Sequence, residues 1–296
     1  MLAADEIPAL DANQLAAWLQ RIGIDQAPEA PTLPLLDALI AGQLAHIPFE
    51  NLDALLGRSV SIDLPAVFDK LVRQGRGGYC FELNTLLCAG LKALGYTVTP
   101  LAARVRWNVP EATPTGLSHM LLRVEVAHES YIADVGFGGP TPDRALSLSL
   151  PPDEGTPYRL LPTPVAAASG TGFHCLDLAV RDASADDAGW RVIYRFDLTP
   201  QPGIDFVARN WYVSTHSDSH FTHTLMVART DGDTRLALGN GNLSERAADG
   251  SVRKTVLTSA DAVIDTLAER FHIQLDADLR AALAARLPGV LVGVRG

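Results

Sequence analysis

Apolar residues recur at helical spacing through the first third of the chain. One stripe with i, i+3, i+4, i+7 spacing consists of Leu15, Trp18, Leu19 and Ile22. Asp11 stands where the N-cap of that helix belongs. Further helices are predicted over 33–45, 66–72 and 80–94. Gly95 is placed to end the last of them, because glycine adopts the left-handed conformation of a helix C-cap easily. Residues 1–95 are therefore expected to form a helical bundle.

After residue 95 the period changes from helical spacing to alternation, which is typical of strands. Strands are predicted over 96–107, 119–126, 131–135, 173–180 and 190–197. The segment 140–172 is rich in Pro, Gly, Ser and Thr, and we expect it to make a long excursion without a packed element. Residues 96–202 are therefore expected to form a β-barrel.

The last third of the chain mixes both periods. Strands are predicted over 225–229, 235–238 and 252–257, and helices after Ser259 and over 276–287. We expect residues 203–296 to form an α/β unit. The whole chain is then an α+β protein of three units, and 296 residues suffice for a sizeable core in each.

Composition narrows the function classes. The formal net charge of −10 argues against a nucleic-acid partner, which requires a basic face. No apolar run is long enough for a membrane span, and the first residues lack the basic start of a signal peptide, so no membrane association is expected. The three cysteines form no disulfide framework and suit a reducing compartment, which predicts a cytoplasmic protein.

The strongest candidate for chemistry is Cys80, which follows the pair Gly77-Gly78 and opens an apolar helical pattern. The first turn of a helix offers unpaired N–H groups and the positive end of the macrodipole, and both favour the nucleophilic thiolate. The glycines let the backbone approach a ligand closely or take a positive φ. The alternative is an ordinary buried cysteine, since free cysteine is among the most buried residue types.

His119 and Asp134 supply the partners that a cysteine nucleophile needs. They lie in two short predicted strands joined by a turn at 127–130. Because the start of one hairpin strand faces the end of the next, the two side chains are expected side by side. A thiol nucleophile uses a neighbouring imidazole as base, and a third group orients that imidazole. Cys80, His119 and Asp134 therefore predict a cysteine-protease-like catalytic triad.

Four segments in this order resemble the arylamine N-acetyltransferase family. They are 46–52 (HIPFENL), 76–84 (RGGYCFELN), 134–139 (DVGFGG) and 210–215 (NWYVST). The resemblance implies a helical bundle, a β-barrel and an α/β lid, with the active site in the cleft between the first two. It also implies a ping-pong N-acetyltransferase, in which Cys80 takes an acetyl group from acetyl-coenzyme A and passes it to an aromatic amine or hydrazine. His119 would then be the base and Asp134 the residue that orients it.

Aromatic residues near these motifs are candidates for a dry substrate slot. Phe137 follows Gly136 three residues after Asp134 and is the favoured substrate contact, in agreement with the resemblance. Phe49 is a second candidate, and Phe81 a third, with core packing as the alternative for both.

Coenzyme A carries phosphates, so its site needs cationic or N–H-rich groups. Trp107, Gly116 and Ser118 lie on and after the strand that leads to His119 and are predicted to contact the coenzyme. Thr215 matches a coenzyme-contacting position of the family. Arg104 and Arg106 are further phosphate candidates, with a solvated edge strand as the alternative. No resident cofactor or metal is expected, and the segment 214–224 with its three histidines is interpreted as a solvated loop.

Two other function classes remain open on the sequence. The same triad serves thiol hydrolases and transglutaminase-like acyltransferases. A binding module that holds a coenzyme without turnover is the non-enzymatic alternative, although no member of the triad is missing.

Overall fold

The computed structural model describes residues 6–25, 30–149, 156–163, 175–182 and 189–292. Helix α1 (Ala12–Arg21) begins as predicted, with a reciprocal capping box between Asp11 and Gln14. Helix α2 (Leu33–His46) and helix α5 (Cys80–Ala93) confirm two more of the expected helices. Gly95 takes a φ of +86° just past α5, as the C-cap prediction requires.

Short elements connect these helices. They are β1 (Phe49–Glu50), α3 (Leu52–Leu55), α4 (Leu64–Phe68) and the single π-turn η1 (Asp69–Arg73). The helix predicted over 66–72 is therefore present, but its second half widens into the π-turn.

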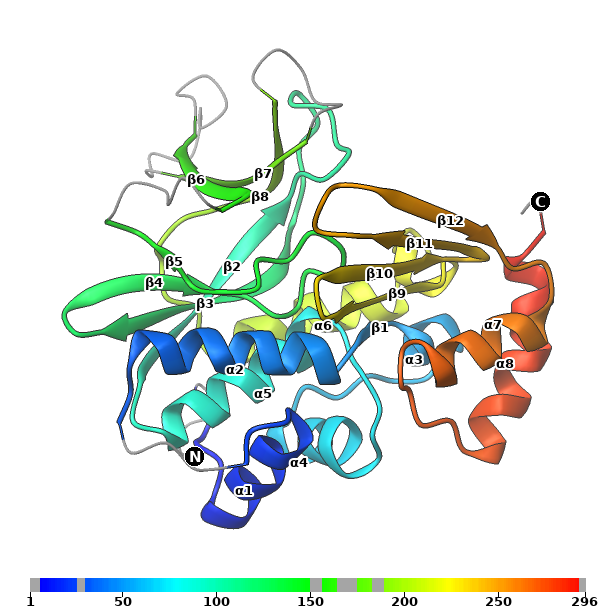
Figure 1. The fold of residues 1–296 in the computed structure, drawn as a ribbon, viewed down its shortest axis with the longest axis horizontal. Helices are drawn as coiled ribbons and strands as arrows, with labels where there is room; N and C mark the ends of the chain where they lie inside the picture. Colours follow the sequence, from blue (N-terminus) through cyan, green and yellow to red (C-terminus); the bar gives the residue numbers. More distant parts are fainter. Residues whose placement is uncertain (1–5, 26–29, 150–155, 164–174, 183–188, 293–296) are drawn as a thin grey trace.

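The larger sheet has seven strands within the described residues and curves into a nearly closed barrel, visible at the top of Figure 1. In spatial order the strands are β5 (Leu146–Ser147), β4 (Glu129–Ala133), β3 (Leu117–Val126), β2 (Thr97–Val105), β8 (Trp190–Phe196), β7 (Leu176–Arg181) and β6 (Tyr158–Pro162). All neighbours pair antiparallel. The start of the strand predicted over 173–180 lies outside the described residues.

One sequence prediction in this region is wrong. The segment 140–172 was expected to hold no packed element, yet β5 and β6 lie within it and form the two edges of the sheet. Tyr158 is buried at the start of β6, where its hydroxyl donates to the carbonyl of Thr141. The high content of proline and glycine in this segment conceals the pairing of these short strands, which is non-local.

A second sheet lies beside the barrel. Its described strands are, in order, β1, β9 (Met226–Asp231), β10 (Thr234–Gly239), β11 (Asn242–Arg246) and β12 (Val252–Val256). The strand β11, whose residues are mostly polar, was not predicted. Helices α7 (Ala260–Glu269) and α8 (Ala277–Val290) pack together beside this sheet, and α7 is capped by Ser259 as expected. Helix α6 (Gly203–Thr215) and the 3₁₀ turn η2 (His220–Thr222) precede it. Residues 216–219 and 223–224 lie outside both elements, and His216, His220 and His223 are half-buried or exposed, so the interpretation of 214–224 as a solvated loop is largely confirmed.

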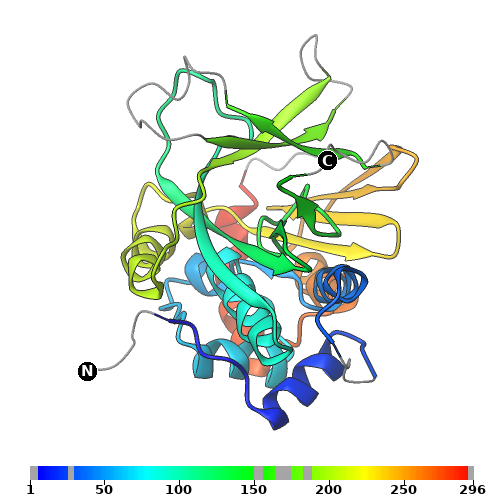
Figure 2. The same ribbon diagram turned by 90° about the vertical axis from the view of Figure 1, so that its left-hand side faces the viewer.

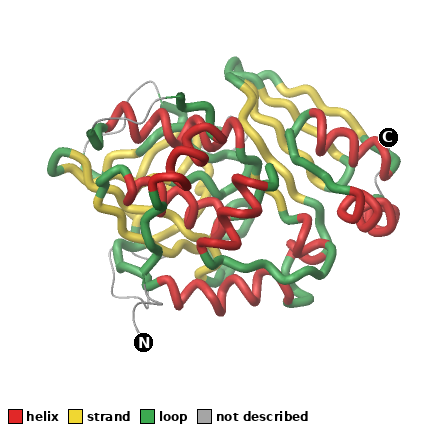
Figure 3. The backbone as a smooth tube through the Cα atoms, turned by 90° about the horizontal axis from the view of Figure 1, so that it is seen from below, coloured by secondary structure: helices red, strands yellow, loops and turns green. Residues whose placement is uncertain are grey.

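Helix α5 is the centre of the molecule, with nearly every residue from Cys80 to Leu91 buried. It packs against β2 and β3 on one side and against α1, α2 and α4 on the other. Figure 2 shows the barrel strands above and the helices below, and Figure 3 shows the helices covering the lower face. No helix among the described residues is long and apolar enough to cross a membrane.

We predict that Gly90→Ala destabilises the fold although alanine is the better helix former. A Cβ at Gly90 would collide with the indole ring of the fully buried Trp18. Overpacking of this kind costs about 1–3 kcal/mol of unfolding free energy. Gly289→Ala in α8 is the matched control, because its nearest neighbour lies at 3.7 Å and the change should be neutral or stabilising. Urea unfolding of both variants measures the difference, and equal midpoints would contradict this account of the packing.

Candidate functional site

Cys80 is the first residue of α5 and is buried. The two glycines before it allow close approach, but to the protein itself: a Cβ at Gly77 would meet the carbonyl of Pro48, and one at Gly78 the carboxylate of Glu82. Neither has a positive φ. The backbone of Gly136 packs against Cys80 from the other side, where a Cβ would lie 2.6 Å from the Cys80 Cα. Cys80 therefore follows one tightly packed pair of glycines in the sequence and is packed against a third glycine in space.

A buried ion network lies beneath the start of α5. Arg76 pairs with Glu50 at 2.7 Å and with Asp53 at 3.2 Å, while Lys70 lies 2.7 Å from both Asp53 and Glu82. The second oxygen of Glu82 accepts the backbone N–H of Tyr79, the N-cap residue of α5, at 3.1 Å. This network attaches the segment before Cys80 to the helical part of the molecule.

His119 and Asp134 meet as predicted. His119 lies on β3 and Asp134 directly follows β4, and Nε2 of the imidazole is 2.7 Å from Asp134 Oδ2. The hairpin turn is shorter than expected, because β4 begins at Glu129 and only Ala127 and His128 have a positive φ. With Nε2 occupied by the carboxylate, Nδ1 is the ring nitrogen left for the thiol of Cys80, which lies close enough to contribute to the raised pKa of His119. The Cys80 Sγ also lies 3.8 Å from the carbonyl oxygen of Ser118.

The electrostatics of this pair favour a strongly basic imidazole. Burial alone disfavours imidazolium, but the charge and hydrogen bond of Asp134 outweigh it and raise the pKa of His119 to about 10. Burial would likewise raise the pKa of Asp134, but the imidazole, Asn84 and the Gly136 N–H lower it below its usual value. The site therefore holds a proton acceptor oriented by a buried carboxylate.

Two residues of this site were not foreseen from the sequence. Asn84 lies one turn after Cys80, and its Nδ2 donates to Asp134 Oδ1 at 2.9 Å and to the Met120 carbonyl at 2.8 Å. Its own Oδ1 accepts the N–H of Val135. The available signal was its position, one turn from the cysteine on the same helix. Tyr194 on β8 packs its ring 4.9 Å from that of His119, and nothing in the sequence marked it.

Of the aromatic candidates, Phe137 lies at the triad. Its ring centroid is 5.5 Å from that of His119 in an edge-on arrangement. Phe49 is buried below Gly138, whose φ is +86°, and its ring lies 6.1 Å from that of Phe221. Phe81 is fully buried between Tyr79 and Phe206, which supports the alternative of core packing for it.

Three of the predicted coenzyme contacts lie in the loop between β2 and β3 or at the start of β3. Ser118 is next to Cys80, as its contact with the thiol shows. Gly116 is exposed with open space around it, and Trp107 packs on the barrel core with the Arg191 guanidinium 5.1 Å from its ring.

Arg104 and Arg106 point into this loop and not toward solvent. Arg106 is buried and donates to the carbonyls of Pro110, Glu111 and Thr113 at 2.7–3.0 Å. Arg104 donates to the carbonyl of Thr115. Both guanidinium groups therefore organise the loop before His119, and the buried Arg106 does not fit the alternative of a solvated edge.

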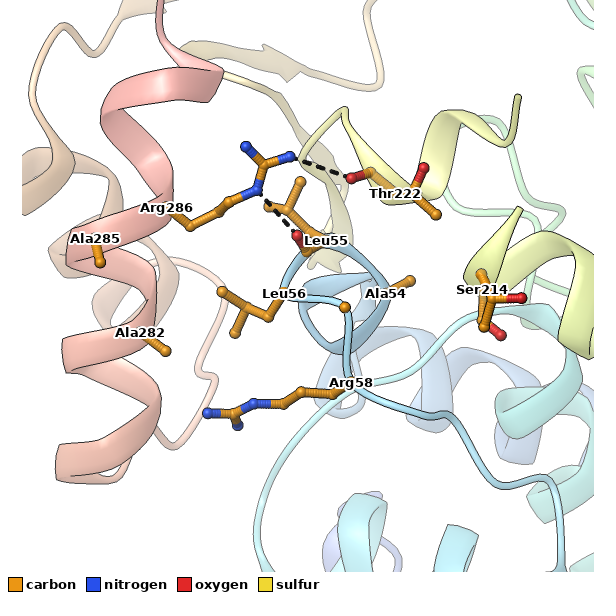
Figure 4. A pocket seen from close by; sticks show the side chains of 11 residues that line it. Ala54, Leu55, Leu56, Arg58, Ser214, Thr222, Ala282, Ala285 and Arg286 are labelled. Carbon is orange, nitrogen blue, oxygen red and sulfur yellow. Dashed lines mark hydrogen bonds between the residues drawn. The ribbon is translucent and has the colours of Figure 1, made fainter. Parts of the chain in front are cut away.

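Thr215 lies apart from this group of contacts. Its hydroxyl donates to the Trp211 carbonyl, and it lines a separate pocket between α3, α6 and α8 (Figure 4). That pocket includes none of Cys80, His119 and Asp134. The described part of the chain contains no group of three side chains arranged to hold a metal ion.

We predict that Asp134→Asn moves the pKa of His119 from about 10 to below its ordinary 6.5, because burial then acts without the carboxylate to oppose it. NMR titration of the imidazole measures this. In the wild type the folded pKa lies above the unfolded one, so the ion pair stabilises fully below pH 6.5 and loses its effect as pH rises through about 10. The stability gap between the two proteins should therefore be larger at pH 7 than above pH 10. An unchanged titration in the variant would show that Asp134 does not control the imidazole.

A further prediction concerns Asn84→Ala, which removes one hydrogen-bond donor from the buried carboxylate of Asp134. We expect it to lower the free energy of unfolding by about 1–3 kcal/mol. The pH profile of Cys80 alkylation by iodoacetamide should shift with it, because the carboxylate acts on the thiol through His119. Thr85→Ala is the control, since Thr85 is buried on the same helix and does not contact Asp134. Identical pH profiles for both variants would show that Asn84 stabilises the packing but does not influence Cys80 through Asp134.

Comparison with known proteins agrees with this geometry. A family model described as N-acetyltransferase matches residues 32–280. The arylamine N-acetyltransferase of Mycobacterium tuberculosis is 40% identical over 288 residues, which cover 95% of this chain and 96% of the relative. A Salmonella typhimurium protein named arylamine N-acetyltransferase / N-hydroxyarylamine O-acetyltransferase is 34% identical over 269 residues, 86% of this chain and 90% of that one.

Solved structures show the same fold. The Mycobacterium marinum arylamine N-acetyltransferase in complex with CoA superposes with a TM-score of 0.83 at 36% identity, covering 93% of this chain and 99% of that one. The resemblance seen in the four sequence segments is thereby confirmed. The chain belongs to the arylamine N-acetyltransferase family and is an acyltransferase.

Proposed function

We propose that this protein transfers an acetyl group from acetyl-coenzyme A to an aromatic amine by a ping-pong mechanism through an acetylated Cys80. The observation that carries the proposal is the buried hydrogen bond between His119 and Asp134, next to a cysteine at the start of α5 that itself contributes to the raised pKa of His119. The CoA complex of the M. marinum relative supports coenzyme A as the donor.

In the first half-reaction His119, which its raised pKa keeps as imidazolium at neutral pH, has already taken the thiol proton, and the Cys80 thiolate attacks the thioester carbonyl. Collapse of the tetrahedral intermediate forms the new C–S bond and breaks the bond to coenzyme A, which leaves as a thiol with the proton from His119. The backbone N–H of Cys80 has no hydrogen-bond partner among the described residues and is available to the oxyanion.

In the second half-reaction an amine takes the place of coenzyme A. His119 removes a proton from the attacking nitrogen, the C–N bond forms, and the proton returns to the Cys80 sulfur as the C–S bond breaks. The ring of Phe137 beside His119 offers an apolar contact for an aromatic acceptor. Hydrazines carry the same nucleophilic nitrogen and belong to the proposed acceptors.

The donor site is proposed to include the loop that Arg104 and Arg106 organise. Trp107 and Gly116 lie in this loop, and Ser118 follows it on β3, where its carbonyl adjoins the thiol. Thr215 is the weaker candidate, because its contacts lie at the separate pocket. The proposed division of the chain at residues 95 and 202 places Cys80 in the first unit and both its partners in the second.

The test is intact-protein mass spectrometry after mixing with acetyl-coenzyme A. Wild type should gain one acetyl group that an aromatic amine such as aniline discharges, whereas Cys80→Ala should gain none. Asp134→Asn should acetylate about 10⁴-fold more slowly, because its imidazole is no longer correctly held. No adduct on wild type would refute the proposal, and an adduct lost equally fast without the amine would favour a thiol hydrolase.

A further inference from the structure

A cavity of about 620 Å³ lies between α3, α6, η2 and α8. This volume is in the range of small-molecule sites. The residues that line it are Ala54, Leu55, Leu56, Gly57, Arg58, Ser214, Thr215, Thr222, Ala282, Ala285 and Arg286. They come from segments far apart in the sequence. Thr215, the weaker coenzyme candidate, is among them, but Cys80, His119 and Asp134 are not.

The charge of this cavity is opposite to that of the whole protein. The chain has a formal net charge of −10, yet the lining contains two arginines and no acidic residue. Figure 4 shows the guanidinium groups of Arg58 and Arg286 on opposite sides of Leu56. An anion entering the cavity would therefore meet two cations and no lining carboxylate.

Arg286 is held in place by its own hydrogen bonds. Its Nε donates to the carbonyl of Leu55 at 3.1 Å, and its Nη2 donates to the carbonyl of Thr222 at 3.3 Å. Its Nη1 makes no hydrogen bond within the described residues. These contacts orient the guanidinium before any ligand arrives, which lowers the entropic cost of binding.

Arg58 is exposed, and its side chain forms no hydrogen bond or ion pair with any residue that the structure describes, although its backbone N–H donates to the Asp53 carbonyl. It acts electrostatically on Asp53, but that carboxylate is already held by Lys70 at 2.7 Å and Arg76 at 3.2 Å. Arg58 is therefore available to a ligand.

The apolar residues that line the cavity indicate whether the anion is inorganic or organic. Ala54, Leu55 and Leu56 form an apolar wall, and Ala282 and Ala285 face it from α8 (Figure 4). A bare inorganic anion would leave this apolar surface in water, whereas an organic body would cover it. We propose that this cavity binds a small organic anion, with its carboxylate attracted by the positive charges of Arg58 and Arg286 and an apolar body against the leucine and alanine side chains.

The test titrates the full-length protein with sodium benzoate and follows backbone amide shifts by NMR. Saturable shifts are expected at α3 and α8. Arg58→Gln should weaken benzoate binding about tenfold, as the loss of one charge-assisted hydrogen bond predicts. Ala285→Phe, at an exposed helix position, should fill the cavity and abolish binding. Arg280→Gln, on the same helix outside the cavity, is the control and should bind as wild type does.

Neutral benzamide and inorganic phosphate should each bind more weakly than benzoate. The proposal would be overturned if benzamide or phosphate bound as tightly as benzoate. It would also be overturned if Arg58→Gln kept full affinity for benzoate, or if coenzyme A displaced benzoate. Acetylation of Cys80 is measured in parallel and should be unchanged in Arg58→Gln. Failure of the anion site and failure of the acetyl-transfer proposal are therefore separate results.

Discussion

The buried carboxylate of Asp134 is the constraint on which the site depends. An ionised carboxylate that is removed from water needs hydrogen bonds on both oxygens, or its burial is strongly unfavourable. His119 occupies one oxygen, and Asn84 together with the Gly136 N–H occupies the other. These donors come from β3, from α5 and from the loop after β4, so satisfying one charge fixes three segments relative to one another. The position of Cys80 over His119 follows from this arrangement, because Cys80 and Asn84 are one turn apart on the same helix.

The start of α5 is held from the opposite side by a second set of buried charges. Glu82 caps the N–H of Tyr79 and pairs with Lys70, and burial raises the pKa of Glu82 to about 7 although Lys70 opposes the shift. Tyr79 in turn donates to Asn210 on α6, and Asn51 binds the carbonyls of Phe221 and Thr224. The nucleophile therefore sits where barrel, helices and second sheet are joined. A reacting sulfur held this rigidly favours a defined attack geometry.

Much of the fold and of the candidate site could be predicted from residues that are neighbours in the sequence. The cap at Asp11, the glycine at position 95 and the helix beginning at Cys80 each depend on a few neighbouring residues, and all are present. The meeting of His119 and Asp134 was predicted from hairpin geometry and is confirmed, although the β3–β4 pairing ends with Ala133 opposite Leu122 and does not make the two residues cross-strand partners. The missed features depend on distant partners. Strand β6 forms an edge by pairing with β7, and β1 pairs with β9 across most of the chain. The inward turn of Arg106 likewise depends on where the carbonyls of a folded loop lie.

The most direct measurement of the central account is a double-mutant cycle on His119 and Asp134, read as the single-turnover rate of Cys80 acetylation. If the carboxylate acts only through the imidazole, His119→Ala and the double variant His119→Ala/Asp134→Ala should be almost equally slow, so that the two effects are strongly non-additive. Fully additive losses would mean that the two residues act independently, and they would contradict the triad.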